Sequence, residues 1–268
     1  MNKISVTILV LFITGVLHGK EFRIITPYIG TINNKLEVSD IDQKLDDSAC
    51  MEGIYLQRID PERYQWNVFL YYSNDINYSS ILGNHFIFDY YLGKTRNGYY
   101  ALGFGFEWLK IDTKTSSLDG ISDFSMLNNV YAPYIRAGKY FNFQLSNHPC
   151  TLFLWGGFES DILRGDLNFR IPSYSPFMPE ILVKEEINEH YEYSLAGIML
   201  QATLHHFLQI KLKYHAKIST DDQNIYHVAS SMVNLYLNRH LGLSYRFKYM
   251  EGVIGDNVYH LLGLAFIH

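Results

Sequence analysis

Hydrophobic residues occupy every second position in many short stretches of this chain. The clearest stretch lies near the end, where Leu241, Leu243, Tyr245, Phe247 and Tyr249 alternate with glycine, serine, arginine and lysine. Because successive side chains of a β-strand point to opposite faces, this pattern predicts a strand with one apolar and one polar face. Stretches of this kind recur about twelve times along the chain, which predicts an all-β, antiparallel protein.

The predicted strands are separated by connections of two kinds. The strands cover 21–32, 50–59, 63–73, 80–92, 100–108, 129–141, 151–160, 189–203, 207–217, 226–237, 241–249 and 258–268. Long and mostly acidic connections lie at 33–49, 112–127 and 161–188, and short ones at 60–63, 93–98, 142–149, 204–206 and 238–239. An even number of strands with short turns at one end and long loops at the other is typical of an up-and-down transmembrane β-barrel. Twelve strands fit best, and ten is the alternative because 50–59 and 226–237 alternate poorly.

The alternation also assigns residues to the two faces of the predicted wall. On the fourth strand Phe86, Phe88, Tyr90 and Leu92 are expected to face outward, and His85 and Asp89 inward. The fifth strand places Ala101, Gly103 and Gly105 on the inner face, where small residues leave room for neighbouring side chains or for a lumen. In a soluble sandwich, the alternative fold, the apolar faces of 208–214 and 100–108 would instead pack on each other.

The first residues have the features of an export signal. Lys3 precedes the apolar run 4–17, which is shorter than the roughly 20 residues of a membrane-spanning helix. We therefore expect residues 1–19 to be a cleavable signal peptide and residues 20–268 to form a single barrel domain.

Composition and charge narrow the possible partners. The 22 Tyr and 17 Phe residues fit the aromatic girdles of a membrane barrel, although a tyrosine-rich soluble protein would share them. A net charge of −5 argues against a nucleic-acid partner, which would require a basic patch. Cys50 and Cys150 are predicted at opposite ends of the barrel wall, too far apart for a disulfide.

In these features the chain resembles the outer-membrane β-barrel proteins of diderm bacteria. The resemblance covers the whole mature chain but is architectural, and it indicates no subfamily. It implies that the last strand, with Gly263 and Phe266, is read by the barrel-assembly machinery. The chain ends in His268 instead of the usual terminal phenylalanine, which departs from that assembly signal. The resemblance also implies the outer membrane as location and its lipids as surroundings.

Charged residues on the inner faces form the candidate site. They are Asp89, Glu107, Arg136 and Glu192, followed by Lys211, Lys213, Arg246 and Lys248 on the ninth and eleventh strands. One interpretation is a charged constriction in which the basic wall favours anions. The other is a network of ion pairs that fills the barrel, because buried charges must be paired.

Other chemistry has weaker support in the sequence. The pair His205 and His206 lacks a third metal ligand, so no metal and no cofactor are expected. His227 and Ser231 lie on one face, but about 13 Å separates residues four apart on a strand, too far for a catalytic dyad. A cross-strand arrangement of catalytic residues stays open.

The functional hypothesis from sequence is a small passive pore for ions or small solutes. The first alternative is a non-conducting barrel of structural or adhesin type, in which an extracellular partner binds the segment 161–188. The second alternative is an outer-membrane enzyme acting on lipid or peptide.

Overall fold

The protein forms twelve β-strands. The computed structural model describes residues 22–38, 43–60, 62–73, 79–118, 121–172, 180–205, 207–221, 223–252 and 255–268. The strands are β1 (Phe22–Val38), β2 (Gln43–Asp60), β3 (Tyr64–Ser73), β4 (Ser79–Thr95), β5 (Gly98–Leu118), β6 (Ile121–Leu145), β7 (His148–Ile171), β8 (Ile181–Leu204), β9 (Leu208–Ser219), β10 (Ile225–Tyr236), β11 (Leu241–Met250) and β12 (Gly255–Ile267). The expected signal peptide, 1–19, lies outside the described residues.

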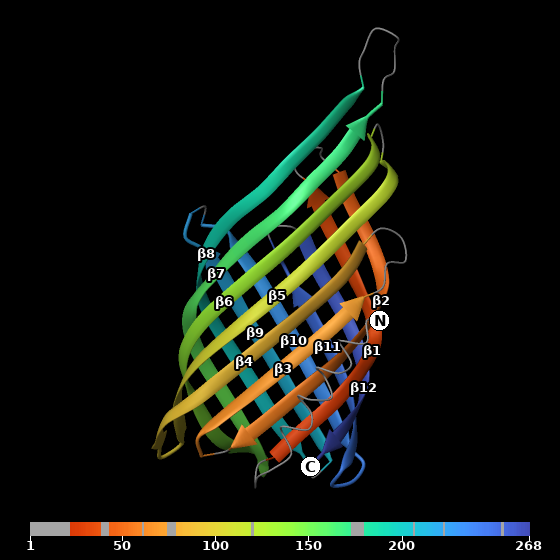
Figure 1. Ribbon diagram of the computed structural model, residues 1–268. Helices are drawn as coiled ribbons and strands as arrows, with labels where there is room; N and C mark the ends of the chain where they lie inside the picture. Colours follow the sequence, from red (N-terminus) through yellow and green to blue (C-terminus); the bar gives the residue numbers. More distant parts are fainter. Residues whose placement is uncertain are drawn as a thin grey trace.

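The strands form one closed antiparallel barrel. Each strand pairs with its neighbours in sequence, and β1 closes the ring by pairing with β12, from Ile24 opposite Ile267 to Leu36 opposite Gly255. Figure 1 shows the tilted strands and the chain end at the lower rim, where the short hairpins also lie. Twelve strands in a closed ring confirm the predicted fold class, so neither the ten-stranded count nor the sandwich holds. No helix among the described residues has the length and apolar character needed to cross a membrane.

The chain reverses direction within each of the five predicted short connections, although strands extend into 93–98 and 142–149. The three long connections are mostly strand. The structure extends β5 to Leu118 and starts β6 at Ile121, so most of the loop predicted at 112–127 is paired backbone. In the same way β7 and β8 run through most of 161–188, and β1 and β2 through most of 33–49. These predictions were wrong because the outward-facing apolar residues end there, whereas the backbone pairing continues.

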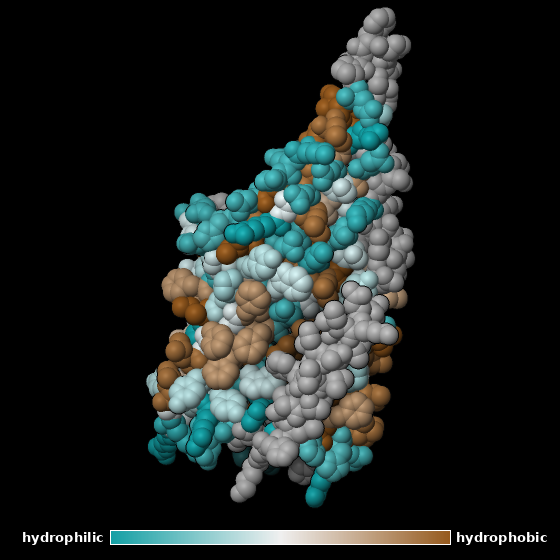
Figure 2. All heavy atoms as spheres, viewed as in Figure 1, coloured by the Kyte–Doolittle hydropathy of each residue, from teal (hydrophilic) through white to brown (hydrophobic). Residues whose placement is uncertain are grey.

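The outer surface has an apolar band between two hydrophilic zones. Outward-facing residues of β7 are apolar at Leu154, Phe158 and Ile162 and become polar at Arg164 and Asp166. Figure 2 shows hydrophobic side chains around the middle and lower part of the visible surface and mainly hydrophilic ones above. A band of this kind is typical of a barrel that spans a membrane.

Four strands continue beyond the band and form a projection that we call the arm. It consists of residues 110–118, 121–129, 164–171 and 181–192, which belong to β5, β6, β7 and β8. Figure 1 shows this sheet rising above the rest of the barrel. The inner side of the arm is apolar and packs with β1, β2 and β4 in one buried cluster. Members of this cluster include Ile32, Ala49, Met51, Ile81, Ile111, Phe124, Met126 and Leu167. Among the described residues, this apolar packing fills the interior at the arm end of the barrel.

Small residues on the inner wall accommodate large neighbours and leave no open lumen there. A Cβ at Gly105 on β5 would overlap the ring of Tyr134 on β6, and a Cβ at Gly197 on β8 would overlap the indole of Trp155 on β7. The space left by these glycines is therefore filled by aromatic side chains of the adjacent strand. Both cysteines are free thiols, with Cys50 exposed and Cys150 buried.

Candidate functional site

The best-formed polar contact inside the barrel is an ion pair between Asp89 on β4 and Arg136 on β6. Arg136 Nε donates to Asp89 Oδ1 at 2.9 Å, and Nη2 donates to Oδ1 at 2.8 Å and to Oδ2 at 2.7 Å. The register places Gly103 of β5 directly between the two residues. A Cβ at Gly103 would overlap the Asp89 carboxylate, so the glycine is what allows the pair to form across an intervening strand.

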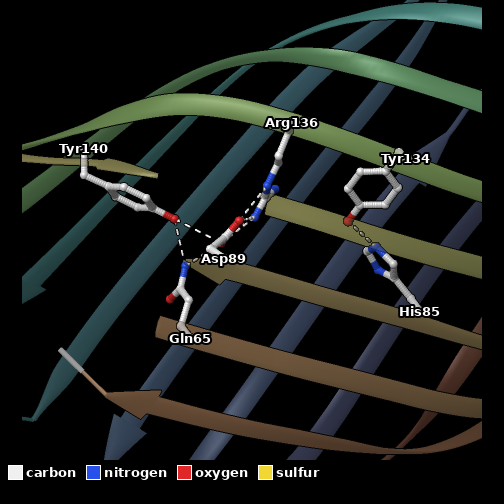
Figure 3. Close-up of polar contacts among 6 residues, drawn as sticks. All are labelled: Gln65, His85, Asp89, Tyr134, Arg136 and Tyr140. Carbon is white, nitrogen blue, oxygen red and sulfur yellow. Dashed lines mark hydrogen bonds and ion pairs between the residues drawn. The ribbon is translucent and has the colours of Figure 1, made fainter. Parts of the chain in front are cut away.

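Neighbouring side chains complete the environment of this pair (Figure 3). Gln65 Nε2 donates to Asp89 Oδ2 at 2.8 Å, and the hydroxyl of Tyr140 donates to the same oxygen at 3.3 Å. The Arg136 guanidinium lies 5.4 Å from the ring centroids of both Phe153 and Trp155. Asp89 is 0% exposed and Arg136 6%, so the charges are removed from water and satisfied by each other.

A second ion pair joins opposite walls of the barrel. Lys248 Nζ on β11 lies 3.3 Å from Glu107 Oε1 on β5. In a ring of twelve strands β5 and β11 are six strands apart in either direction, so this pair crosses the full width of the interior. The barrel is therefore bridged by side chains at this level.

A third group of charges inside the barrel could be predicted only in part from the sequence. Lys217 on β9 forms ion pairs with Glu159 and, at 3.4 Å, with Asp161, both on β7. Lys217 and Glu159 continue the inward alternation of predicted strands, so the pattern could have identified them. Asp161 was not found because the sequence placed it at the start of a loop.

The structure places seven of the eight predicted inward-facing charges around two ion pairs and one cavity. A cavity of about 100 Å³ is lined by Glu107, Lys211, Lys213, Arg246 and Lys248, among other residues. Asp89 and Arg136 form their own ion pair and do not line this cavity. Glu192 was expected on the inner face but is exposed on the outer face, because its neighbour Tyr193 is the buried residue of β8.

A larger cavity opens at the end of the barrel where the C-terminal residue lies, which we call the terminal end. It has a volume of about 530 Å³ and is lined by Ile24, Gln57, Ile59, Gln201, Phe207, Gln209, Lys211, Met232, Tyr236, Leu237, Asn238, Arg239 and Ile267. Lys211 and Met232 line both cavities, so the two are neighbours. We call the larger one the vestibule. The polar interior is thus reached from the terminal end, whereas the described side chains at the arm end form the buried apolar cluster.

The outer face carries one serine–histidine contact. Ser160 Oγ on β7 lies 2.7 Å from His190 Nε2 on β8, where the apolar band meets the arm. His227, singled out in the sequence, instead forms a 2.6 Å hydrogen bond with the Tyr214 hydroxyl through Nδ1. His205 is in ring contact with His148, and His206 lies outside the described residues. No group of three or more potential metal ligands occurs in the part of the chain that the structure describes.

Comparison with solved structures identifies the fold. The translocator domain of the autotransporter NalP from Neisseria meningitidis superposes with a TM-score of 0.57 over 98% of this chain and 94% of that chain, at 13% sequence identity. This chain has the fold of a bacterial outer-membrane β-barrel. At that identity the likeness to the translocator domain extends to the fold alone.

Two further barrels are similar at lower scores. The toluene transporter TodX of P. putida gives a TM-score of 0.49 at 8% identity, with 93% of this chain and 90% of that chain covered. The transport unit of the autotransporter AIDA-I from Escherichia coli gives 0.45 at 9% identity, with 98% and 97% covered. No protein-family model matches the sequence. No curated protein matches it either.

Proposed function

We propose that the protein is an outer-membrane barrel that does not conduct in the conformation described and that presents its arm at the cell surface. The location rests on the apolar band and on the shared fold. The observation that carries the non-conducting state is the Lys248–Glu107 ion pair, which joins opposite walls at 3.3 Å. The apolar cluster at the arm end adds a second closure, because Met51, Ile81 and Phe124 are almost completely buried there.

The arm fits a surface that binds a partner. Residues 181–190 of β8 pair with β7 on one edge, whereas the pairing with β9 begins only at Tyr193. The other edge of this segment therefore faces no strand among the described residues. An exposed strand edge offers backbone hydrogen bonds to an extended peptide. Its three glutamates against one lysine favour a peptide with basic side chains. A partner bound at this edge would make the protein the adhesin-type barrel that the sequence analysis gave as an alternative.

Single-channel recording tests the proposal against the small passive pore inferred from the sequence. The mature chain is refolded into a planar bilayer, and heat-modifiable migration on gels shows that the barrel has formed. Protection of the band from protease shows that it has inserted. A closed barrel gives no discrete steps under these conditions.

Reproducible steps from a folded and inserted barrel would instead support the passive pore. In that case the variants Lys211→Gln and Lys213→Gln separate an anion-selective pore from an unselective one. Removing these positive charges from an anion-selective pore would shift its reversal potential in a salt gradient toward cations.

The contact between Ser160 and His190 supports a second candidate, a hydrolase acting on esters at the membrane surface. In such an enzyme the His190 imidazole would take the proton of the Ser160 hydroxyl as the oxygen attacks an ester carbonyl, and would return it to the leaving alcohol. A water molecule would then release the acyl group. The position at the upper border of the apolar band suits lipid esters.

Turnover of a dispersed phospholipid decides this second candidate. If the pair is catalytic, Ser160→Ala abolishes the hydrolysis by the refolded chain, because the nucleophile is lost. Ser230→Ala is the matched control, since Ser230 lines the interior cavity. A wild-type chain that is folded and inert, or a Ser160→Ala variant with full activity, would exclude the hydrolase.

A further inference from the structure

Four basic side chains form two adjacent rows on the inner wall of β9, β10 and β11. The register places Lys211, Met232 and Arg246 in one row and Lys213, Ser230 and Lys248 in the next. Neighbouring strands lie about 4.8 Å apart, so the bases of each row stand about 10 Å apart with a β10 residue between them. Lysine and arginine side chains are long enough to converge over that strip.

Three of these four bases have no acidic partner. Lys248 is paired with Glu107, but within the described part of the chain no carboxylate forms an ion pair with Lys211, Lys213 or Arg246. Arg246 lies 4.6 Å from the ring centroid of Phe69, and its Nη1 is buried with no hydrogen-bond partner. The aromatic contact positions the guanidinium but leaves this donor unsatisfied.

The interior of the barrel has more positive than negative groups. The described inward-facing bases of the barrel below the arm are Arg136, Lys211, Lys213, Lys217, Arg246 and Lys248, and the acids are Asp89, Glu107, Glu159 and Asp161. Six positive groups against four negative groups leave an excess of two. An uncompensated charge away from bulk water is costly, so this interior favours an anion that carries about two negative charges.

The place for such an anion is the cavity of about 100 Å³. Lys211, Lys213, Arg246 and Ser230 all line it, and its volume is enough for several water molecules or one tetrahedral oxyanion. Lys211 also lines the vestibule of about 530 Å³, which opens at the terminal end. An anion can therefore arrive from that end.

We propose that this cavity binds a dianionic phosphate group. Lys211 and Lys213 supply the two charges, Arg246 donates through its unsatisfied Nη1, and the hydroxyl of Ser230 donates from the middle of the wall. Lysine and arginine are the usual phosphate-binding side chains, and their charge-assisted hydrogen bonds are the strong ones. The group is either free inorganic phosphate or the head of a phosphate monoester whose remainder occupies the vestibule.

Calorimetric titration of the refolded chain in phosphate-free buffer tests the proposal with inorganic phosphate and glycerol 3-phosphate as probes. Inorganic phosphate is expected to bind at one site per chain. A clearly tighter glycerol 3-phosphate identifies a monoester as the ligand, and equal affinity identifies the free anion. A folded barrel that takes up neither probe would overturn the proposal.

Variants locate the site. Lys213→Met should weaken phosphate binding about tenfold or more, and Lys213→Arg should retain most of it. The matched control is Lys110→Met, because Lys110 faces outward at the base of the arm. If Lys213→Met fails to refold, Ser230→Ala replaces it and should weaken binding by a few fold. Equal weakening by Lys110→Met, or full affinity in Lys213→Met and Ser230→Ala, would contradict a site in this cavity.

Discussion

The band and the arm are built from the same strands but have their apolar residues on opposite faces. In the band, β5 points Phe104 and Phe106 outward and Glu107 inward. In the arm, the same strand points Lys110 outward and buries Ile111. The backbone alternation continues without a break, and only the apolar face changes sides.

The change of face fits the surroundings proposed for each region. In the proposed membrane location lipid surrounds the band, so apolar side chains face outward and the charged ones of the barrel interior face inward. In the same location water surrounds the arm, so its apolar side chains turn inward and form the buried cluster at the arm end. On β7 the change occurs between Ile162 and Arg164, which is where we expect the membrane boundary on that strand.

The largest expected effect is a loss of stability when a positive charge is removed from the interior of the band, compared with the outer face of the arm. Arg136→Met leaves Asp89 buried without its partner, which should cost about 3–5 kcal/mol of unfolding free energy. Arg164→Met removes a charge from the outer face of the arm, where a substitution typically changes stability by less than about 0.5 kcal/mol. Urea unfolding of both variants in lipid vesicles measures the difference.

Two comparisons test whether the cost of Arg136→Met comes from the buried and unpaired Asp89. Equal stability of Arg136→Met and Arg164→Met would mean that water reaches Asp89. If the double variant Asp89→Leu with Arg136→Met recovers most of the loss, the cost lies in the unpaired carboxylate and not in the lost packing of the guanidinium.

The sequence predicted the strand count and the faces of the band because lipid imposes a simple rule on every second residue. Phe69 and Tyr71 on the buried side of β3, and Tyr72 on the exposed side, follow the expected alternation. The five short turns are predictable for the same reason, since the alternation stops where the chain turns.

The strands of the arm were not predicted in this way because their outward-facing residues are polar. Their inward-facing apolar residues are widely spaced in the sequence. In 112–127 the inward Phe124 and Met126 are the strand signal, but Asp112, Lys114 and Asp123 have the composition of a loop. Continuing the inward and outward alternation of the band into this segment would have predicted the strands of the arm.

The partners of the interior charges depend on distances that sequence does not contain. The alternation points Glu107 and Lys248 inward, yet only the closed ring shows that they meet across its full width. The pair of Asp89 and Arg136 depends likewise on Gly103 in the strand between them. The basic wall of β9 and β11 was recognisable as a pattern, but not which of its members lack a partner.

The position of the membrane boundary can be tested by introducing arginine at two outward-facing positions of β7. The expected effect on stability is smaller than that of Arg136→Met. Leu154→Arg puts a charge on the lipid-facing side of β7 and should cost about 2–4 kcal/mol of unfolding free energy in lipid vesicles. Asp166→Arg is on the same face of the same strand in the arm, directly opposite Glu186 on β8. It replaces two like charges by an opposite pair, so it should be neutral or stabilise by less than about 1 kcal/mol.

The comparison of these two variants depends on the membrane alone, because the strand, the face and the new residue are the same. Repeating the unfolding in detergent micelles provides the control, since a flexible micelle can thin around an arginine more easily than a bilayer. The cost of Leu154→Arg should therefore fall in micelles, whereas the effect of Asp166→Arg should stay the same. If Asp166→Arg were as costly as Leu154→Arg in vesicles, the boundary would lie beyond Asp166, and the arm would be a part of the barrel inside the membrane.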